Sequence, residues 1–239
     1  MRTLAPNPTL ANMVFRVFLY NCLLAAFTGW LVVAFATGAV AQTKAPTLRI
    51  VVLGDSLAAG YQLKTTDSFP AQLERALKAK GHAVEVINAG VSGDTTANGL
   101  ERLRWAVPER TDAVILELGA NDALRGQDAA RAKANLEKII TVLKAGGSEV
   151  LLAGMIAPRN LGEDYTRTFN GMYPELAQKH GLILYPFFLD GVALNGDLNL
   201  GDGIHPNPKG VAEITRRILP KVEELIARVR ARQPTGPKG

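Results

Sequence analysis

The chain has little cysteine, little histidine and none of the common metal or phosphate motifs. Its 239 residues include one cysteine, Cys22, and three histidines. An internal disulfide is therefore excluded, and the C-x-x-C and H-x-x-E-H metal patterns do not occur. The phosphate-binding patterns G-x-x-x-x-G-K-S/T and G-x-G-x-x-G are absent as well. We therefore expect neither a metal ion nor another cofactor in this protein.

Charge of one sign is not concentrated anywhere along the chain. Lys and Arg number 27 against 22 Asp and Glu, which gives a formal net charge of +5, and these residues are spread along the sequence. Binding to nucleic acid usually requires a run or patch of basic residues. We expect no nucleic-acid partner. Hydrophobic residues make up 47% of the sequence, a proportion typical of a globular protein with a sizeable core.

The N-terminal segment differs in composition from the rest. Residues 17–41 contain no charged side chain and directly follow Arg16. The run ends in small residues that match an A-x-A cleavage pattern at positions 39–41. This pattern predicts a signal peptide over residues 1–41, followed by a short linker over 42–47. We expect a periplasmic or secreted protein after cleavage.

Two alternatives concern this segment. Translation from Met13 would give a signal peptide with an ordinary n-region. The apolar run is also long enough to span a bilayer, so an uncleaved membrane anchor is the alternative to cleavage. A chain without cysteine after residue 41 needs no thiol or disulfide chemistry to fold in an oxidising compartment.

The chain after the linker alternates apolar stretches with amphipathic ones. The apolar stretches, rich in β-branched residues, are predicted strands and cover residues 48–53, 84–88, 113–119, 149–156 and 182–187. The amphipathic stretches are predicted helices and include residues 68–81, 128–147, 163–181 and 208–232. Trp105 is predicted to pack between a helix and the sheet. The last seven residues, 233–239, are predicted to be a flexible tail.

Continuously apolar strands that alternate with helices favour a parallel sheet covered on both faces. The predicted fold is therefore α/β, a three-layer α/β/α sandwich with a five-stranded parallel sheet. Residues 48–232 form one domain in this prediction, and we expect a monomer or a weak homo-oligomer.

Small polar residues gather where the predicted strands end. They form the sequences GDS (54–56), NAGVSGDTT (88–96), GANDALRG (119–126) and GDGIHPN (201–207). The carboxyl ends of parallel strands meet at one edge of a sheet, and ligands bind there. Ser56 has three interpretations at this position: a nucleophile, a helix N-cap or part of a phosphate cradle. The missing phosphate motifs disfavour the last of these.

A serine nucleophile needs a base, and the three histidines differ as candidates. His82 and His180 adjoin glycines that end predicted helices, and we interpret both as structural. His205 lies in a loop three residues after Asp202. The Asp202 carboxylate could reach one ring nitrogen and leave the other to face Ser56. The alternative is a loop aspartate in a turn beside a surface histidine.

Taken together, the four sequence blocks resemble the GDSL, or SGNH, hydrolase family over nearly all of residues 48–225. GDSLAAGY matches its nucleophile block, NAGVSGDTT its second block, GAND its G-x-N-D block and DGIHPN its final D-x-x-H block. Ala120 stands where close relatives often have glycine. The residues of these blocks are most similar to those of a periplasmic branch of acyl-CoA thioesterase, lysophospholipase and arylesterase enzymes.

The resemblance implies a flavodoxin-like SGNH hydrolase fold and a role for each matching residue. Ser56 would be the nucleophile and His205 the general base, oriented by Asp202. The oxyanion hole would consist of the backbone N–H groups of Ser56 and Gly93 and the side-chain amide of Asn121. Glycine allows a close approach of backbone to ligand, and an uncharged amide can bind an oxyanion without a permanent ion pair.

Further residues are assigned to substrate binding or to loop shape. We predict substrate contacts for Asp55, Leu57, Asp122, Ile156, Pro158 and Ile204. Asp55, Asp94 and Asp122 are also interpreted as acceptors that hold the loop backbone. An acyl pocket needs an apolar lining, for which the chain offers Met155, Leu161, Phe187, Phe188, Leu189, Val192 and Leu194. These seven side chains fit the hydrophobic core equally well.

The predicted activity is hydrolysis of carboxylic esters or thioesters of acyl substrates through an acyl-enzyme. The expected partner is a small-molecule or lipid ester, and a lipid substrate would bring the protein into peripheral contact with membrane lipid. The alternatives are a carbohydrate O-acetyl esterase of the same fold and a non-catalytic binding module. An O-acetyl esterase would more often show aromatic stacking platforms, which are not evident here.

Overall fold

The computed structural model describes residues 46–232. The predicted signal peptide, most of the predicted linker and the predicted C-terminal tail lie outside the described residues. No helix within 46–232 combines the length and the apolar character that crossing a membrane requires.

The centre of the molecule is a five-stranded sheet in the order β2-β1-β3-β4-β5, and every neighbouring pair is parallel. Its strands are β1 (Leu48–Gly54), β2 (Val84–Gly90), β3 (Ala113–Glu117), β4 (Glu149–Ala153) and β5 (Ile183–Tyr185). Every residue of β3 is buried, as expected for a central strand covered on both faces. The predicted five-stranded parallel sheet is confirmed.

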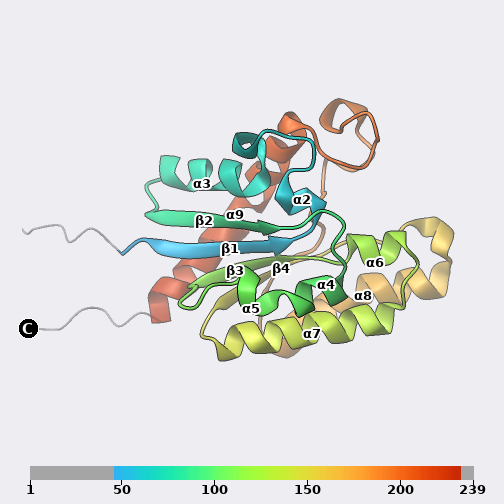
Figure 1. Ribbon diagram of the computed structural model, residues 1–239, viewed down its shortest axis with the longest axis horizontal. Coiled ribbons are helices and arrows are strands. Elements are labelled where there is room, and N and C mark those ends of the chain that lie inside the picture. The colour runs from blue at the N-terminus through green and yellow to red at the C-terminus, as the bar shows by residue number, and fades with distance from the viewer. Residues whose placement is uncertain (1–45, 233–239) are drawn as a thin grey trace, which may run out of the picture. The chain divides into compact units, whose positions relative to one another are not determined.

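Helices cover both faces of this sheet (Figure 1). The helices are α2 (Ser56–Ala59), α3 (Phe69–Ala79), α4 (Thr96–Glu101), α5 (Leu103–Ala106), α6 (Ala120–Leu124), α7 (Ala129–Ala145), α8 (Glu163–His180) and α9 (Pro208–Arg232). Short 3₁₀ turns are η1 (Thr65–Asp67), η2 (Arg159–Leu161) and η3 (Gly196–Leu198). Helices α3 and α9 pack together on one face, and α7 packs with α4 and α8 on the other. This is the predicted three-layer arrangement.

Three strands are shorter than the sequence pattern predicts. β3 ends at Glu117, β4 ends at Ala153, and β5 covers only residues 183–185. Pro186 has no N–H and directly follows β5, so the pairing cannot continue there. The apolar residues beyond these strand ends, Met155 and Phe187 among them, line a cleft above the sheet.

The prediction for Trp105 is wrong. Its side chain is 80% exposed, whereas Leu103 of the same short helix is buried. Helix α5 has only four residues, so it presents one narrow face to the sheet, and the indole points away from that face. The presence of an aromatic residue in this mixed segment was therefore an insufficient indication of burial.

Candidate active site

The turn between β1 and α2 places Ser56 at the carboxyl edge of the sheet. β1 ends at Gly54, and Ser56 is the first residue of α2. The intervening Asp55 is the N-cap: its Oδ1 accepts a hydrogen bond from the backbone N–H of Leu57 at 3.0 Å. The capping role considered for Ser56 therefore belongs to Asp55, and the Ser56 hydroxyl is available for another contact.

The Ser56 hydroxyl lies next to His205. Its Oγ is 3.0 Å from His205 Nε2, and His205 Nδ1 is 2.7 Å from Asp202 Oδ2. The three side chains thus form a continuous hydrogen-bonded series, although Ser56 and His205 are 149 positions apart in the chain. This is the geometry in which an imidazole removes a proton from a serine while a carboxylate fixes its tautomer.

Asp202 is held in its charged form by its own loop. The backbone N–H groups of His205 and Ile204 both donate to Asp202 Oδ1, at 3.0 and 2.9 Å. These two bonds, followed by the contact with the His205 ring, lower the pKa of Asp202 to about 2. The Asp202 carboxylate is therefore ionised at neutral pH.

The segment that contains the acid and the base is a small hairpin. Leu200 N–H donates to His205 O at 2.7 Å, Asn207 N–H donates to Leu198 O at 2.9 Å, and Asn199 bridges Pro206 in antiparallel fashion. The relative position of Asp202 and His205 is thus set within one short stretch of chain.

Tyr61 packs against the base. The centroids of the Tyr61 and His205 rings are 4.5 Å apart, with a tilt of 39° between their planes. An aromatic neighbour at this distance restricts rotation of the imidazole. Tyr61 belongs to the GDSLAAGY block, but nothing in the local sequence pattern indicates which side chain it contacts.

A cavity of about 310 Å³ opens beside these residues. Its lining includes Ser56, His205 and Asn121, and five of the predicted substrate contacts, Asp55, Leu57, Ile156, Pro158 and Ile204. Of the apolar candidates, Met155, Phe187, Leu189 and Leu194 line it. Phe188 and Val192 are fully buried in the core instead, and Leu161 is also outside the lining.

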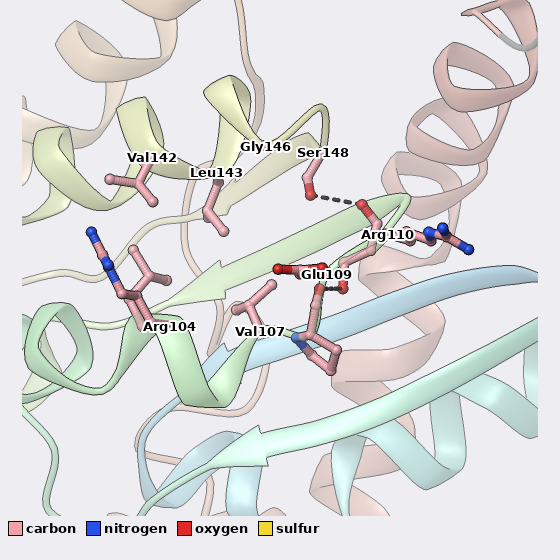
Figure 2. Close-up of a pocket in the computed structure, with 11 residues that line it drawn as sticks. Arg104, Val107, Glu109, Arg110, Val142, Leu143, Gly146 and Ser148 are labelled. Carbon is pink, nitrogen blue, oxygen red and sulfur yellow. Dashed lines mark hydrogen bonds between the residues drawn. The ribbon is translucent and has the colours of Figure 1, made fainter.

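A second cavity of similar size, about 320 Å³, lies at the opposite edge of the sheet (Figure 2). Its lining includes Arg104, Val107, Glu109, Arg110 and Val142. The polar side chains Thr111 and Ser148 donate to the backbone carbonyls of Pro108 and Thr111. The lining contains no serine–histidine pair, and no histidine at all.

The predicted oxyanion donors come from three separate segments: Ser56 begins α2, Gly93 lies in the loop before α4, and Asn121 lies in α6. Within residues 46–232, neither the N–H of Ser56 nor that of Gly93 donates a hydrogen bond to another protein atom. Gly93 has a φ of +88°, which favours glycine, although it is not part of the cavity lining. Asn121 Nδ2 donates to Asp55 Oδ2 at 3.1 Å and to the backbone oxygen of Asp94 at 3.0 Å.

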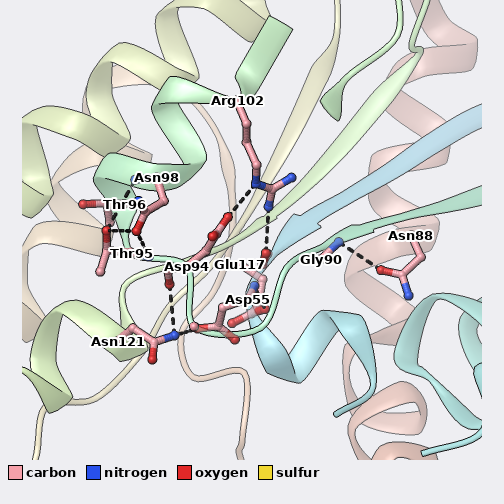
Figure 3. A network of polar contacts seen from close by, with 12 residues as sticks. Asp55, Asn88, Gly90, Asp94, Thr95, Thr96, Asn98, Arg102, Glu117 and Asn121 are labelled. Atoms are coloured by element: carbon pink, nitrogen blue, oxygen red, sulfur yellow. Dashed lines mark hydrogen bonds and ion pairs between the residues drawn. The ribbon is translucent and has the colours of Figure 1, made fainter. Parts of the chain in front are cut away.

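The aspartates beside these donors form a buried network (Figure 3). Asp94 pairs with Arg102, and Asp55 accepts from Asn121. Burial raises the pKa of Asp55 to about 6, although the Leu57 N–H, the nearby imidazole and the Asn121 amide each lower it. A charged Asp55 therefore costs stability, which its contact with Asn121 partly offsets.

The structure does not support a substrate contact for Asp122. Both carboxylate oxygens of Asp122 are used by Thr96: Oδ2 accepts from its backbone N–H at 2.8 Å and Oδ1 from its hydroxyl at 2.7 Å. The side chain is 2% exposed and lies outside the cavity lining. Asp122 instead joins α6 to the start of α4, the loop-holding role that was the alternative interpretation.

The remaining histidines lie in other surroundings. His82 Nε2 is 3.2 Å from Glu223, and His180 Nε2 is 3.2 Å from Glu137. Each of these glutamates also pairs with a lysine. His82 and His180 thus join helices at the surface, as predicted for structural residues.

Two residues beneath the site have no counterpart in the sequence analysis, Glu117 and Arg102. Glu117 is fully buried at the end of β3, and its Oε2 accepts from the N–H of Asp55 at 3.3 Å. Arg102 donates to Gly54 O at 3.0 Å. An acidic residue in the otherwise apolar stretch AVILELG was a detectable signal for Glu117. Arg102 had none, because arginines are common on exposed helices.

Comparisons with known proteins agree with this geometry. Residues 52–213 match the GDSL-like Lipase/Acylhydrolase family. The chain is 40% identical to an arylesterase of Vibrio mimicus over 195 residues, which covers 80% of this chain and 96% of the relative. It is 38% identical to thioesterase 1/protease 1/lysophospholipase L1 of Escherichia coli strain K12, with coverage of 74% and 84%.

Solved structures give the same result. The crystal structure of TesA superposes with a TM-score of 0.70 at 35% identity and covers 74% of this chain and 99% of TesA. The chain therefore belongs to the GDSL-like lipase/acylhydrolase family. It is an ester-cleaving serine hydrolase of the SGNH type, and its substrates are small-molecule esters.

Proposed function

We propose that the protein hydrolyses acyl esters of aryl alcohols and lysophospholipids through an acyl-enzyme on Ser56. One observation underlies this assignment: Ser56 Oγ is 3.0 Å from His205 Nε2, and Asp202 is 2.7 Å from the other ring nitrogen. A helix N-cap or a surface histidine would not require this alignment of three side chains.

The reaction follows from these contacts. Neutral His205 takes the proton of Ser56 as Oγ attacks the acyl carbon, and Asp202 stabilises the resulting imidazolium. The N–H groups of Ser56 and Gly93 and the amide of Asn121 receive the developing negative oxygen. His205 then gives its proton to the leaving alcohol, and the ester bond breaks. Water repeats the sequence on the acyl-enzyme and releases a carboxylic acid, which restores the hydroxyl of Ser56.

The side chains around the cavity support the proposal that the acyl group of the substrate is apolar. Four of the large apolar side chains exposed in residues 46–232 line it: Leu124, Ile156, Leu194 and Ile204. Leu194 is 97% exposed and has a φ of +65°, which is unfavourable for leucine in both respects. Such a residue suits contact with an acyl chain or with a lipid surface, and we propose that this rim meets membrane lipid.

The expected location follows from the N-terminal sequence. An uncharged run over residues 17–41 that ends in an A-x-A pattern supports export to the periplasm or beyond the cell. An exported enzyme rarely meets acyl-CoA. We therefore propose oxygen esters, rather than CoA thioesters, as the physiological substrates, although relatives of this chain include a thioesterase.

The experiment is hydrolysis of p-nitrophenyl esters from acetate to palmitate by the wild type, Ser56→Ala and Ser148→Ala. Ser148 is a matched control because it is a buried serine at the opposite edge of the sheet. We expect Ser56→Ala to lose roughly 10⁴-fold or more in kcat, and Ser148→Ala to remain near the wild type. A reactive phosphonate ester should add to the wild type in equimolar amount and leave Ser56→Ala unlabelled.

Chain length separates the remaining functions. A preference for medium or long chains would support the proposed acyl esterase. Activity confined to acetate would contradict it and favour a carbohydrate O-acetyl esterase. No activity on any chain, without labelling by the phosphonate, would favour a non-catalytic binding module. For the lipid contact, Leu194→Ser should reduce binding of the Ser56→Ala protein to lysophospholipid-containing vesicles.

A further inference from the structure

The peptide unit between Gly54 and Asp55, directly before Ser56, is held from both sides. Its N–H, on Asp55, donates to Glu117 Oε2 at 3.3 Å. Its carbonyl, on Gly54, accepts from Arg102 Nη2 at 3.0 Å and from the backbone N–H of Val91 at 3.1 Å. Neither Glu117 nor Arg102 lines the catalytic cavity, so neither can contact a substrate from there.

A glutamate at position 117 destabilises the folded state. Its side chain is fully buried, its Oε1 has no hydrogen-bond partner, and no ion pair joins it within residues 46–232. Burial first, and the neighbouring Asp55 carboxylate second, raise the pKa of Glu117 well above its usual range. We therefore treat Glu117 as a neutral acid. A leucine would fill the same space at lower cost, so packing does not explain an acid here.

Gly54, the last residue of β1, leaves the space that the Glu117 carboxyl occupies. A Cβ on Gly54 would lie 2.4 Å from Glu117 Oε2 and 2.7 Å from its backbone oxygen. Any side chain at position 54 would therefore displace Glu117 from the Asp55 N–H. The glycine before the Asp55–Ser56 pair is required by the contact with Glu117 as well as by the turn.

Arg102 connects the same peptide to the neighbouring loop. Its Nε donates to Asp94 Oδ2 at 2.5 Å, and both side chains are largely buried, 14% and 11% exposed. Asp94 directly follows Gly93, and its backbone oxygen accepts from Asn121. Arg102 thus contacts the loop that contains Gly93 and the peptide before Ser56, while Asn121 contacts Asp94 and Asp55 (Figure 3).

We propose that Glu117 and Arg102 are positioning residues that clamp the Gly54–Asp55 peptide and so fix the spacing of the three oxyanion donors. The inference rests on the proposed function, in which Ser56, Gly93 and Asn121 supply those donors. The donors belong to separate segments that follow β1, β2 and β3, and stabilisation of an oxyanion depends on donors that are in place before charge develops. A shift of about 1 Å at such a site can lower the rate by roughly a hundred-fold.

The test measures kcat and KM separately for Glu117→Leu, Glu117→Gln, Arg102→Met and Arg102→Lys. Arg104→Met is the matched control, since Arg104 lies two residues away at the second cavity. We expect Glu117→Leu and Arg102→Met to lower kcat by roughly ten- to a hundred-fold, with KM within about twofold. Glu117→Gln keeps an acceptor and the shape, so we expect it to retain kcat within about threefold.

Arg102→Lys keeps the charge but cannot reach Asp94 and Gly54 together, so its kcat should fall between those of Arg102→Met and the wild type. All rates are measured below the melting temperature of each variant. If Glu117→Leu and Arg102→Met melt earlier but keep the wild-type kcat, both residues are structural and the proposal is wrong. If Glu117→Leu does not fold, the Arg102 pair and the kcat of Glu117→Gln decide.

Failure of the proposed function would look different. An active Ser56→Ala protein would remove the nucleophile assignment whatever the clamp variants do. An inactive Ser56→Ala protein beside clamp variants with unchanged kcat would contradict the clamp alone.

Discussion

The molecule has two cavities of nearly equal volume, about 310 and 320 Å³, at opposite edges of the same sheet. The cavity at the carboxyl edge is lined by a serine, a histidine and an asparagine, and the serine and histidine are hydrogen-bonded to one another. In the cavity at the amino edge, Thr111 and Ser148 bond only to nearby backbone carbonyls. Volume therefore does not distinguish a candidate active site in this fold.

The difference arises from the direction of the strands. The loops after β1, β2 and β3 leave the sheet at its carboxyl edge. The order in which strands are added changes direction between β1 and β3, and ligands bind at such a switch point in open α/β sheets. Polar groups from loops distant in sequence are brought together there. At the amino edge the chain enters the strands, and Thr111 is bonded to Pro108, three residues before it. The predictions below test this contrast, in order of decreasing effect.

The largest effect is expected from removing the charge that faces the base. Asp202→Asn should lower kcat by roughly 10³- to 10⁴-fold, because an amide at this position no longer stabilises the imidazolium and can fix the wrong tautomer. Steady-state kinetics on a p-nitrophenyl ester measures it. Asp197→Asn, an exposed change in the same loop, is the control. A loss of less than about tenfold would mean that Asp202 only shapes the loop.

Removing one oxyanion donor should have the next largest effect. Asn121→Ala is expected to lower kcat by roughly 10²- to 10³-fold, because we propose this side-chain amide as one of the donors to the developing negative oxygen. Its rate of phosphonylation should fall in parallel. Asn160→Ala, at an exposed position on η2, should leave both rates unchanged. An Asn121→Ala enzyme with a normal kcat and a weakened fold would show that Asn121 serves only Asp55 and Asp94.

The third prediction concerns stability and pH. In the folded state Glu117 keeps its proton above pH 4.5, its ordinary pKa, whereas the unfolded chain releases it. Wild-type stability therefore falls as pH rises through this range, and Glu117→Gln lacks this loss. Between about pH 5 and about pH 8 the stability of the variant should therefore rise relative to that of the wild type. Urea unfolding at both pH values measures this, and a constant difference would indicate that Glu117 is charged.

The smallest effect is expected at the amino edge. Trp105→Ala removes a side chain that is 80% exposed on α5, the helix from which Leu103 and Arg104 line the second cavity. We expect kcat and KM to stay within about twofold of the wild type on every chain length. A change of about fivefold or more in either constant would contradict the view that only the carboxyl edge is functional. It would indicate that the amino edge also affects the reaction.

The order of the strands and long helices was predictable from the sequence, because the strands are continuously apolar stretches and the long helices are amphipathic. The sequence placed Ser56, Asp202 and His205 as candidates through residue type and motif, and the structure brings them together. It did not predict Glu117, Arg102 or Tyr61, since these residues act through contacts between loops far apart in the chain. The predicted burial of Trp105 and the predicted substrate contact of Asp122 were wrong for the same reason. Whether a side chain is buried, and what it contacts, depends on its neighbours in space.

The hairpin over residues 198–207 has a consequence for how members of this fold diverge. Because its internal hydrogen bonds fix Asp202 and His205 to one another, the acid and the base form a cassette that can be exchanged between related chains as one piece. What a new host must supply is a serine at the right distance from Nε2. Recombination at this segment could therefore change the loop that faces the substrate without separating the base from the carboxylate that orients it.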